Sequence, residues 1–328
     1  MLKLATFIAA LLFAVGVLTA CGGDNASPSA SPSRVNPSVS PQSPTELELP
    51  INVAVTLPLF EDFVREVGRE NVVVLSLVPA GVDPHSYELT AGDVDRLRGV
   101  DFFFVNGLGL DRKIHEVVEA RRDETAYLIP FAPNIRSPRR GELGNPELTA
   151  EQARDNAHLW LDPAIAAVYA EIIADEFIIY DGIREDFYTL SFSAYKDEML
   201  ALVQEIEAQI QTIPEANRKL VTHHDSFAHF ARKFGLEVVG SAVTNPGNQA
   251  AAADIDRLVQ AVRDQGIPAV FSEHGYDDAA MEQMASEAGV EVCALQSDIL
   301  ADGGTTYIEM MRANVAELVR CLGGSAPQ

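Results

Sequence analysis

The sequence predicts an α/β protein with two lobes, each a parallel β-sheet flanked by helices, joined by a single long rigid helix. Three observations predict this fold class. Short β-rich apolar runs alternate with helical stretches in both halves of the chain, and an apolar stripe with helical spacing separates the halves. In addition, 47% of the 328 residues are apolar and 22% are charged, which is typical of a well-packed globule.

The first lobe is predicted over residues 48–183. Its four strands are expected at Ile51–Thr56, Val72–Val78, Asp101–Asn106 and Ala126–Pro130. Its four helices are expected at Leu59–Val67, Thr90–Leu97, Leu110–Arg121 and Pro163–Ile179. The last helix has a strong start signal, because Asp162 can cap free amides and Pro163 suits the first helical position.

A connecting helix is predicted over residues 184–214. Its apolar side chains recur at three- and four-residue spacing and form one stripe: Tyr195, Met199, Leu202, Ile206, Ile210 and Ile213. Pro214 ends the pattern, and a helix of this length spans roughly 40 Å. We expect the stripe to pack in the core, and we expect the helix to make the joint between the lobes comparatively rigid.

The second lobe is predicted over residues 215–328. Its strands are expected at Leu220–His223, Glu237–Ser241, Ala269–Glu273 and Val290–Gln296. Its helices are expected near Phe227–Phe234, Ala253–Gln265, Asp278–Ala288 and Tyr307–Cys321. This alternation of strand and helix again predicts a parallel sheet covered by helices.

The first 47 residues predict export and a membrane tether. Residues 1–20 contain Lys3 followed by an apolar run, which is typical of a signal peptide. Residues 18–21 read LTAC, the form of a bacterial lipoprotein processing site, so Cys21 is expected to carry lipid. Residues 21–47 are expected to be a disordered tether, since seven serines and five prolines fall between Asp24 and Glu46. We therefore expect a protein anchored outside the cytoplasm, in a periplasm or at a cell surface; secretion without lipid is the alternative.

Export places the other two cysteines in an oxidising compartment. Cys293 lies in an apolar strand-like run, and Cys321 lies at the end of the last predicted helix. Two cysteines in such a compartment are candidates for a disulfide that closes the C-terminal section of the chain, and two buried free thiols are the alternative.

The charge of the chain excludes one class of partner. Acidic residues outnumber basic ones 48 to 24, and the net charge of −24 argues against binding to nucleic acid phosphates. The glycine-rich patterns of nucleotide sites are also absent from the sequence.

Three histidines lie at the ends of predicted elements. His85 lies in a Gly/Pro loop after a strand, His158 comes just before the helix that starts at Pro163, and His224 ends a strand. Asp298 follows the last strand. Ligands gather at the carboxyl ends of parallel strands, so we expect these four side chains to converge in the cleft between the lobes.

Three imidazoles and one carboxylate form a tetrahedral set that suits Zn²⁺. Asp225 and Glu273 could orient the imidazoles, because a metal-bound histidine usually donates its other N–H to an acceptor. Taken alone, a loop histidine is more often a surface or hydrogen-bonding residue than a ligand. The other histidines are expected to pack, to form hydrogen bonds or to lie at the surface: His115, His223, His229 and His274.

Five runs of the chain resemble those of the metal-binding solute-binding proteins that supply zinc and manganese ABC importers, the ZnuA/TroA group. The runs are VDPHSYE at 82–88, NGLGLD at 106–111, HLWLDP at 158–163, HDSF at 224–227 and TYIEMMRANV at 306–315. They occur in order over nearly the whole mature chain. The two α/β lobes and rigid connecting helix of that family agree with the fold class predicted above.

The resemblance implies a function and a ligand set. The protein would capture Zn²⁺ outside the cytoplasm and deliver it to a membrane permease, as a monomer and without a chemical step. His85, His158, His224 and Asp298 would hold the ion. Members that carry Mn²⁺ tend to have a carboxylate at the third of these positions, whereas imidazole suits Zn²⁺.

Two other functions are weighed against this one. A manganese or broad divalent-metal carrier of the same family is the first alternative. An exported zinc hydrolase is the second, but it would need an open coordination position and a nearby base, and the HExxH pattern is absent from the sequence.

Overall fold

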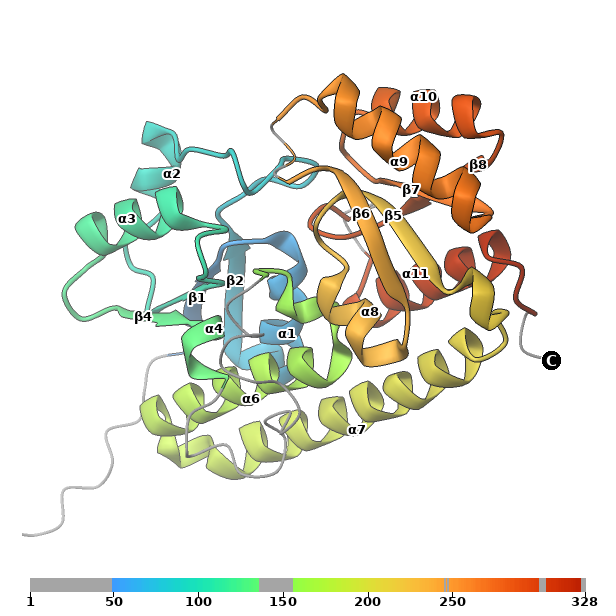
Figure 1. Ribbon diagram of the computed structural model, residues 1–328. Helices are drawn as coiled ribbons and strands as arrows, with labels where there is room; N and C mark the ends of the chain where they lie inside the picture. The colour runs from blue at the N-terminus through green and yellow to red at the C-terminus, as the bar shows by residue number, and fades with distance from the viewer. Residues whose placement is uncertain (1–48, 136–155, 245, 247, 301–304, 326–328) are drawn as a thin grey trace, which may run out of the picture. The chain divides into compact units, whose positions relative to one another are not determined.

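The computed structural model describes residues 49–135, 156–244, 246, 248–300 and 305–325. The predicted signal peptide (1–20), the predicted lipidation residue Cys21 and the predicted tether (21–47) lie outside these described residues. Two four-stranded parallel sheets form the described part of the chain, each flanked by helices (Figure 1). The predicted fold class is confirmed.

The first sheet has four parallel strands in the order β2-β1-β3-β4. The strands are β1 (Ile51–Val55), β2 (Val72–Ser76), β3 (Phe102–Val105) and β4 (Tyr127–Pro130). The helices of this lobe are α1 (Pro58–Gly68), α2 (Ala91–Asp95), α3 (Arg112–Arg121), α4 (Phe131–Asn134) and α6 (Pro163–Tyr180). Successive side chains of a strand point to opposite faces, so Phe102 and Phe104 pack with α1 and α6, whereas Phe103 packs with α3.

The second sheet has the same topology, with the order β6-β5-β7-β8. Its strands are β5 (Lys219–His224), β6 (Glu237–Val243), β7 (Ala269–Glu273) and β8 (Glu291–Leu295). Its helices are α8 (Ala228–Phe234), α9 (Ala252–Gln265), α10 (Ala279–Ala288) and α11 (Tyr307–Cys321). Each sheet reverses its strand order beside its first strand, and such a switch point is where an open parallel sheet binds ligands.

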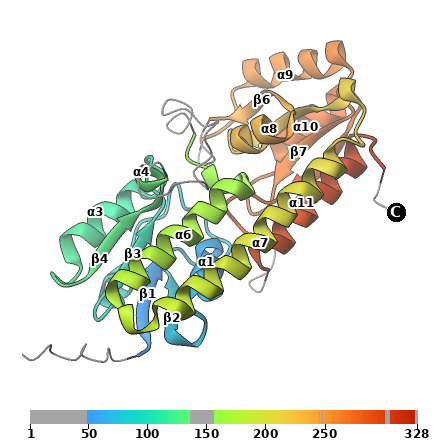
Figure 2. The ribbon, with the colours of Figure 1, turned by 90° about the horizontal axis from the view of Figure 1, so that it is seen from below.

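Helix α7 (Glu185–Ile210) runs along both lobes, as Figures 1 and 2 show. It has 26 residues and is therefore about 39 Å long. Its apolar stripe is buried, and the helix packs against α1 and α6 of the first lobe and against α8 and α11 of the second. Buried side chains of α1, α6, α7, β5 and α11 belong to one hydrophobic cluster, so the inner faces of the two lobes share a core.

The connecting helix is shorter than the predicted range of 184–214. Arg184 belongs to a preceding 3₁₀ turn (Gly182–Arg184), and the α-helical hydrogen bonding ends at Ile210, four residues before Pro214. The short helix α4 and the isolated 3₁₀ turns have no apolar period long enough to predict them. Among the described residues, no helix combines the length and the apolar content that a membrane crossing requires.

Polar contacts also join the two lobes beside α7. The Asp62 carboxylate on α1 accepts hydrogen bonds from the Tyr195 hydroxyl (3.1 Å) and from the Tyr307 backbone N–H (3.0 Å) at the start of α11. The Tyr307 hydroxyl donates to the Trp160 carbonyl oxygen (2.7 Å), and its ring packs on Phe63 at 5.1 Å between centroids. Segments of both lobes and of α7 therefore meet around one buried aromatic cluster.

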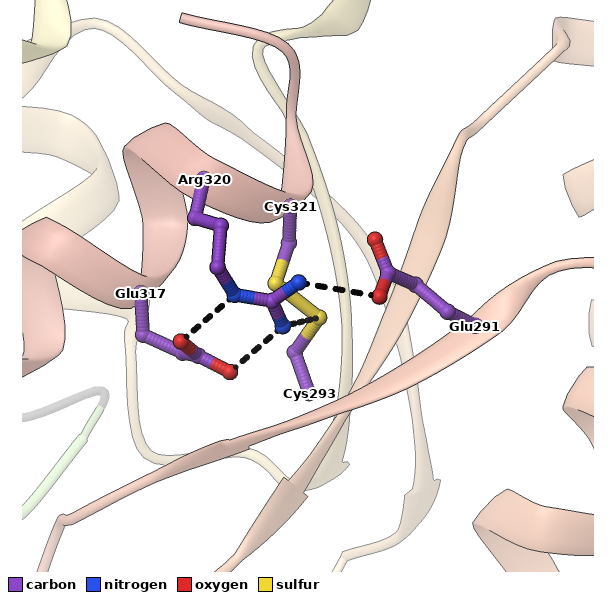
Figure 3. Close-up of a disulfide and its surroundings, with 5 residues drawn as sticks. All are labelled: Glu291, Cys293, Glu317, Arg320 and Cys321. Atoms are coloured by element: carbon purple, nitrogen blue, oxygen red, sulfur yellow. Dashed lines mark hydrogen bonds and ion pairs between the residues drawn. A yellow bond between two sulfur atoms is a disulfide. The ribbon is translucent and has the colours of Figure 1, made fainter. Parts of the chain in front are cut away.

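A disulfide joins Cys293 on β8 to Cys321 at the end of α11 (Figure 3). Of the two alternatives that the sequence leaves open, the structure has the disulfide and not the free thiols. The Arg320 guanidinium lies over the bridge and donates to Cys293 Sγ at 3.2 Å, and it also pairs with Glu317 and Glu291. The bridge ties the edge strand of the second sheet to the last helix.

Candidate metal centre

Four predicted site residues meet between the lobes: His85, His158, His224 and Asp298. His158 Nε2 lies at the centre, 3.3 Å from His85 Nε2, 3.1 Å from His224 Nε2 and 3.2 Å from Asp298 Oδ1. Asp298 Oδ2 lies 3.2 Å from His224 Nε2 and 3.4 Å from His85 Nε2. Four donors bound tetrahedrally to one ion at zinc distances lie about 3.3 Å apart, so a single ion could contact all four side chains.

His85 is positioned by its own loop. The Asp83 carboxylate accepts a hydrogen bond from the His85 backbone N–H at 2.9 Å and another from the Ser86 hydroxyl at 2.7 Å. This local turn projects the imidazole out of the first lobe toward the other three side chains. The His85 side chain is 15% exposed, against 5% or less for the others, so it forms the rim of the cluster.

His158 precedes the short 3₁₀ turn at Leu159–Leu161 and is oriented by Asn156. Asn156 Oδ1 accepts from the His158 backbone N–H at 2.9 Å and lies 2.8 Å from His158 Nδ1. An amide oxygen can only accept, so Nδ1 carries a proton and Nε2 presents its lone pair to the cluster. Asn156 is held in turn by donating to the Asp225 carbonyl oxygen at 2.6 Å.

His224 and Glu273 end the neighbouring strands β5 and β7, at the switch point of the second sheet. Glu273 Oε1 accepts from the His224 backbone N–H at 3.0 Å and lies 3.1 Å from His224 Nδ1. Its Oε2 accepts from the Ser226 hydroxyl at 2.8 Å. The carboxylate therefore lies at the Nδ1 edge of the His224 ring, and Nε2 faces the cluster.

Asp298 follows β8 and is completely buried at its side chain. The Trp160 indole N–H donates to the neighbouring Ser297 carbonyl at 3.2 Å, which links the His158 segment to the Asp298 segment. Asp298 Oδ2 accepts a hydrogen bond from the Tyr276 hydroxyl at 2.8 Å, whereas Oδ1 is buried without a hydrogen-bond donor among the described residues. A cavity of about 730 Å³, lined by residues of both lobes, reaches Asp298.

Burial and neighbouring charges shift the pKa values of these groups in opposite directions. Burial lowers the pKa of His158. Burial also acts to lower the pKa of His224, but the Glu273 and Asp298 carboxylates outweigh it and raise that pKa to about 10. Burial acts to raise the pKa of Asp298, yet the facing imidazoles hold it well below its usual range. The raised pKa of His224 and the lowered pKa of Asp298 both favour a charged pair of these two side chains.

Residues at the switch point of the first sheet hold the His158 segment through hydrogen bonds. The buried Asp111 carboxylate accepts from the Thr56 hydroxyl (2.7 Å) and from the backbone N–H groups of Asn106 (2.5 Å) and Gly107 (3.0 Å). The Asn106 amide then donates to the Ala157 carbonyl oxygen at 2.9 Å, one residue before His158. The NGLGLD run thus holds the His158 segment in place.

The other predicted positions are placed as follows. His223 is buried and stacks on Tyr276 at 5.3 Å between ring centroids. His229 is buried, and its Nε2 lies 2.9 Å from the Asn156 carbonyl oxygen. His274 is exposed, and His115 is half-buried on α3.

Two residues at the site were not predicted from the sequence: Asn156 and Tyr276. Asp225 was predicted to orient an imidazole; Asn156 lies next to His158 Nδ1, and Asp225 accepts a hydrogen bond from Asn156 through its backbone carbonyl oxygen. An Asn two residues before a histidine is a local signal that could have indicated this role, because such a side chain readily bonds the backbone two residues on. Tyr276 offers no comparable signal in the sequence.

The structure has two parallel-sheet lobes and a long helix that runs along both. Three histidines and an aspartate form a buried cluster between the lobes. These features together define a metal-binding substrate-binding protein. The chain belongs to the family described as zinc-uptake complex component A, periplasmic, which it matches over residues 53–321. It is thus the substrate-binding component of a metal ABC importer and not an enzyme. The resemblance to the ZnuA/TroA group is confirmed.

Relatives in this family carry names for two different metals. The chain is 27% identical over 274 residues to the manganese-binding lipoprotein MntA of Halalkalibacterium halodurans, which covers 82% of this chain and 87% of that one. It is 28% identical over 284 residues to the zinc-binding protein TroA of Treponema pallidum, with 82% and 88% covered. The solved structure of TroA from Treponema pallidum superposes with a TM-score of 0.73, at 27% identity, over 83% of this chain and 98% of that one.

Proposed function

We propose that this protein carries Zn²⁺ as its cargo and that His85, His158, His224 and Asp298 bind the ion. The observation that carries the proposal is the position of His158 Nε2, within 3.3 Å of a donor atom on each of the other three side chains. Three imidazole nitrogens and a carboxylate oxygen at this spacing can all contact one cation. Three nitrogen donors and one carboxylate suit Zn²⁺ better than Mn²⁺, which favours oxygen.

The metal content of the full-length protein tests this proposal. We expect the stripped protein, offered equal Zn²⁺ and Mn²⁺ at neutral pH, to retain one zinc per chain by elemental mass spectrometry. A His224→Ala variant is expected to lose that zinc, whereas a His115→Ala variant on α3 keeps it. Retention of manganese in preference to zinc would make the protein a manganese carrier of the same family, and retention of no metal would refute the site.

The metal affinity is expected to rise with pH. Because the pKa of His224 is raised to about 10 in the metal-free chain, zinc must displace a proton from this imidazole at any lower pH. The lowered pKa of His158 leaves that ring neutral near pH 7, so it adds no second proton there. The zinc affinity should therefore increase by about tenfold per pH unit between pH 7 and 9. Calorimetry in two buffers of different ionisation enthalpy would count the protons released when zinc binds. A zinc affinity that does not change with pH would contradict this prediction.

We also propose that the chain is anchored through lipid on Cys21, acts as a monomer and delivers its ion to a membrane permease. The LTAC run, the Ser/Pro-rich segment after it and the lipoprotein names of relatives support the anchor. The naming of relatives as substrate-binding lipoproteins of metal ABC transporters supports the permease. Incorporation of labelled fatty acid into the wild-type chain, but not into a Cys21→Ser variant, tests the anchor.

A further inference from the structure

Asn156 is held on two sides by the second lobe. Its side-chain amide donates to the Asp225 carbonyl oxygen at 2.6 Å, and its own carbonyl oxygen lies 2.9 Å from His229 Nε2. Asp225 directly follows β5, and His229 lies in the first turn of α8, so both belong to the segment that follows His224. Asn156 lies on the chain that leads through His158 into α6 of the first lobe. These two contacts therefore join the lobes next to the cluster.

The surroundings of His229 fix the position of its proton. The Asn156 carbonyl oxygen can only accept a hydrogen bond, so His229 Nε2 carries the proton and donates it. The Arg232 guanidinium can only donate, and its Nη1 lies 3.1 Å from His229 Nδ1, which therefore accepts. Burial lowers the pKa of His229 to about 4, so the ring is neutral near pH 7. His229 is only 2% exposed, and both of its ring nitrogens have a partner.

These contacts leave the Asn156 amide one orientation. Because the Asp225 carbonyl oxygen can only accept, the nitrogen end of the amide faces it and Oδ1 faces His158. Oδ1 then keeps the His158 proton on Nδ1, which leaves Nε2 free to bind a metal. A buried polar network is rigid when all its members are paired. The segment that carries His224 thus also sets the position of His158, and the Nε2 atoms of these two rings lie 3.1 Å apart.

We propose that His229 is a positioning residue that holds Asn156 from the second lobe and thereby keeps His158 in its metal-binding orientation. This inference rests on the proposed function, because it assumes that His158 binds the cargo. His229 makes no bond to the ion and acts only through Asn156. Without the His229 N–H, the buried Asn156 carbonyl oxygen would lose its donor, and a shift of the segment to regain one would move the acceptor of the His158 ring.

A double-mutant cycle on the full-length protein tests this dependence. Zinc affinity is measured for His229→Leu, which removes the donor, for Asn156→Ala and for the variant with both changes. His229→Gln is the conservative variant, because its amide nitrogen can take the position of Nε2 and donate from there. Asn217→Ala is the matched control, since the Asn217 amide also donates to a backbone carbonyl oxygen, that of Leu322 at 3.0 Å, at the other end of β5 from the site.

We expect Asn156→Ala to weaken zinc binding by about 10–100-fold and His229→Leu by about tenfold, the range typical for lost partners of metal ligands. The double variant should bind zinc as Asn156→Ala does, because His229 acts through Asn156. His229→Gln and Asn217→Ala should keep the wild-type affinity. Additive losses in the double variant, or an unchanged affinity in His229→Leu, would overturn the inference and leave the zinc carrier intact. Failure of the wild-type protein to retain any metal would instead refute the proposed function.

NMR of the histidine side chains provides a second test that does not depend on the folding of His229→Leu. In the wild-type protein labelled with nitrogen-15 histidine, we expect His229 to carry its proton on Nε2 and His158 to carry its proton on Nδ1. The His229 signals are assigned by their absence from His229→Gln, in which His158 should keep its Nδ1 proton. A wild-type His229 with its proton on Nδ1 would overturn the inference.

Discussion

A His158→Ala variant is expected to bind zinc at least about a hundredfold more weakly than the wild-type protein. Closed four-ligand zinc sites bind with roughly 10–16 kcal/mol, so one ligand of four accounts for about 3 kcal/mol. His158 should reach at least this loss, because its Nε2 is the atom next to all three other side chains and its side chain is only 5% exposed. Competition with a chromophoric chelator of known affinity would measure the change.

Alanine variants of His85 and His158 compare the zinc affinity contributed by the proposed ligand at the rim of the cluster with that contributed by the ligand at its centre. His85→Ala is expected to lose less affinity than His158→Ala, because the His85 side chain is 15% exposed and water can take its coordination position. His274→Ala is the control, since that residue follows Glu273 directly but is exposed. Equal zinc affinity in His158→Ala and the control would contradict the proposed ligand set.

Removal of the disulfide is expected to lower the free energy of unfolding by about 3.5 kcal/mol, the loop-entropy value for cysteines separated by 28 residues. The effect should appear in a Cys293→Ala/Cys321→Ala variant, because both side chains are buried and the substitution adds no volume. At the size of this chain the melting temperature should fall by about 6 °C. Denaturant unfolding followed by circular dichroism would measure both quantities on the metal-free protein.

Reductant provides the internal comparison for this prediction. It should lower the stability of the wild-type protein toward that of the double variant and leave the double variant unchanged. If the wild type and the double variant unfold at the same denaturant concentration, the bridge does not contribute to stability in the way proposed. Metal must be removed beforehand, since bound zinc would stabilise the folded state of either protein.

Much of the fold was predictable because its signals are local. A buried strand such as β7 is a short apolar run, and α11 begins at Thr306 with a capping box that lies entirely within four residues. Bounds were less accurate where tertiary contacts decide them. Strand β2 ends at Ser76, two residues before the predicted end at Val78, although the Leu77 and Val78 N–H groups still donate to the Val55 and Thr56 carbonyl oxygens.

The candidate site was predictable to the level of its histidines and its aspartate. Their positions after strands or before a helix, together with the family motifs, indicate convergence at the carboxyl ends of the sheets. The position of Glu273 beside His224 was predictable from its place at the end of β7. The hydrogen bond from His158 to Asn156 spans only two residues and is local, whereas the hydrogen bond from Asn156 to the Asp225 carbonyl oxygen depends on the tertiary structure.

The sequence by itself determined two parallel sheets, a long helix with one buried stripe, and imidazoles at the ends of particular elements. These features depend only on the spacing of residue types along the chain, and the sequence gives that spacing directly. Only the tertiary structure decided which atoms meet. Tyr276 and Asp83 are 193 residues apart, yet their side chains approach at the same site as Asp298. Such a contact depends on how two lobes pack on a shared core, and no local pattern encodes that packing.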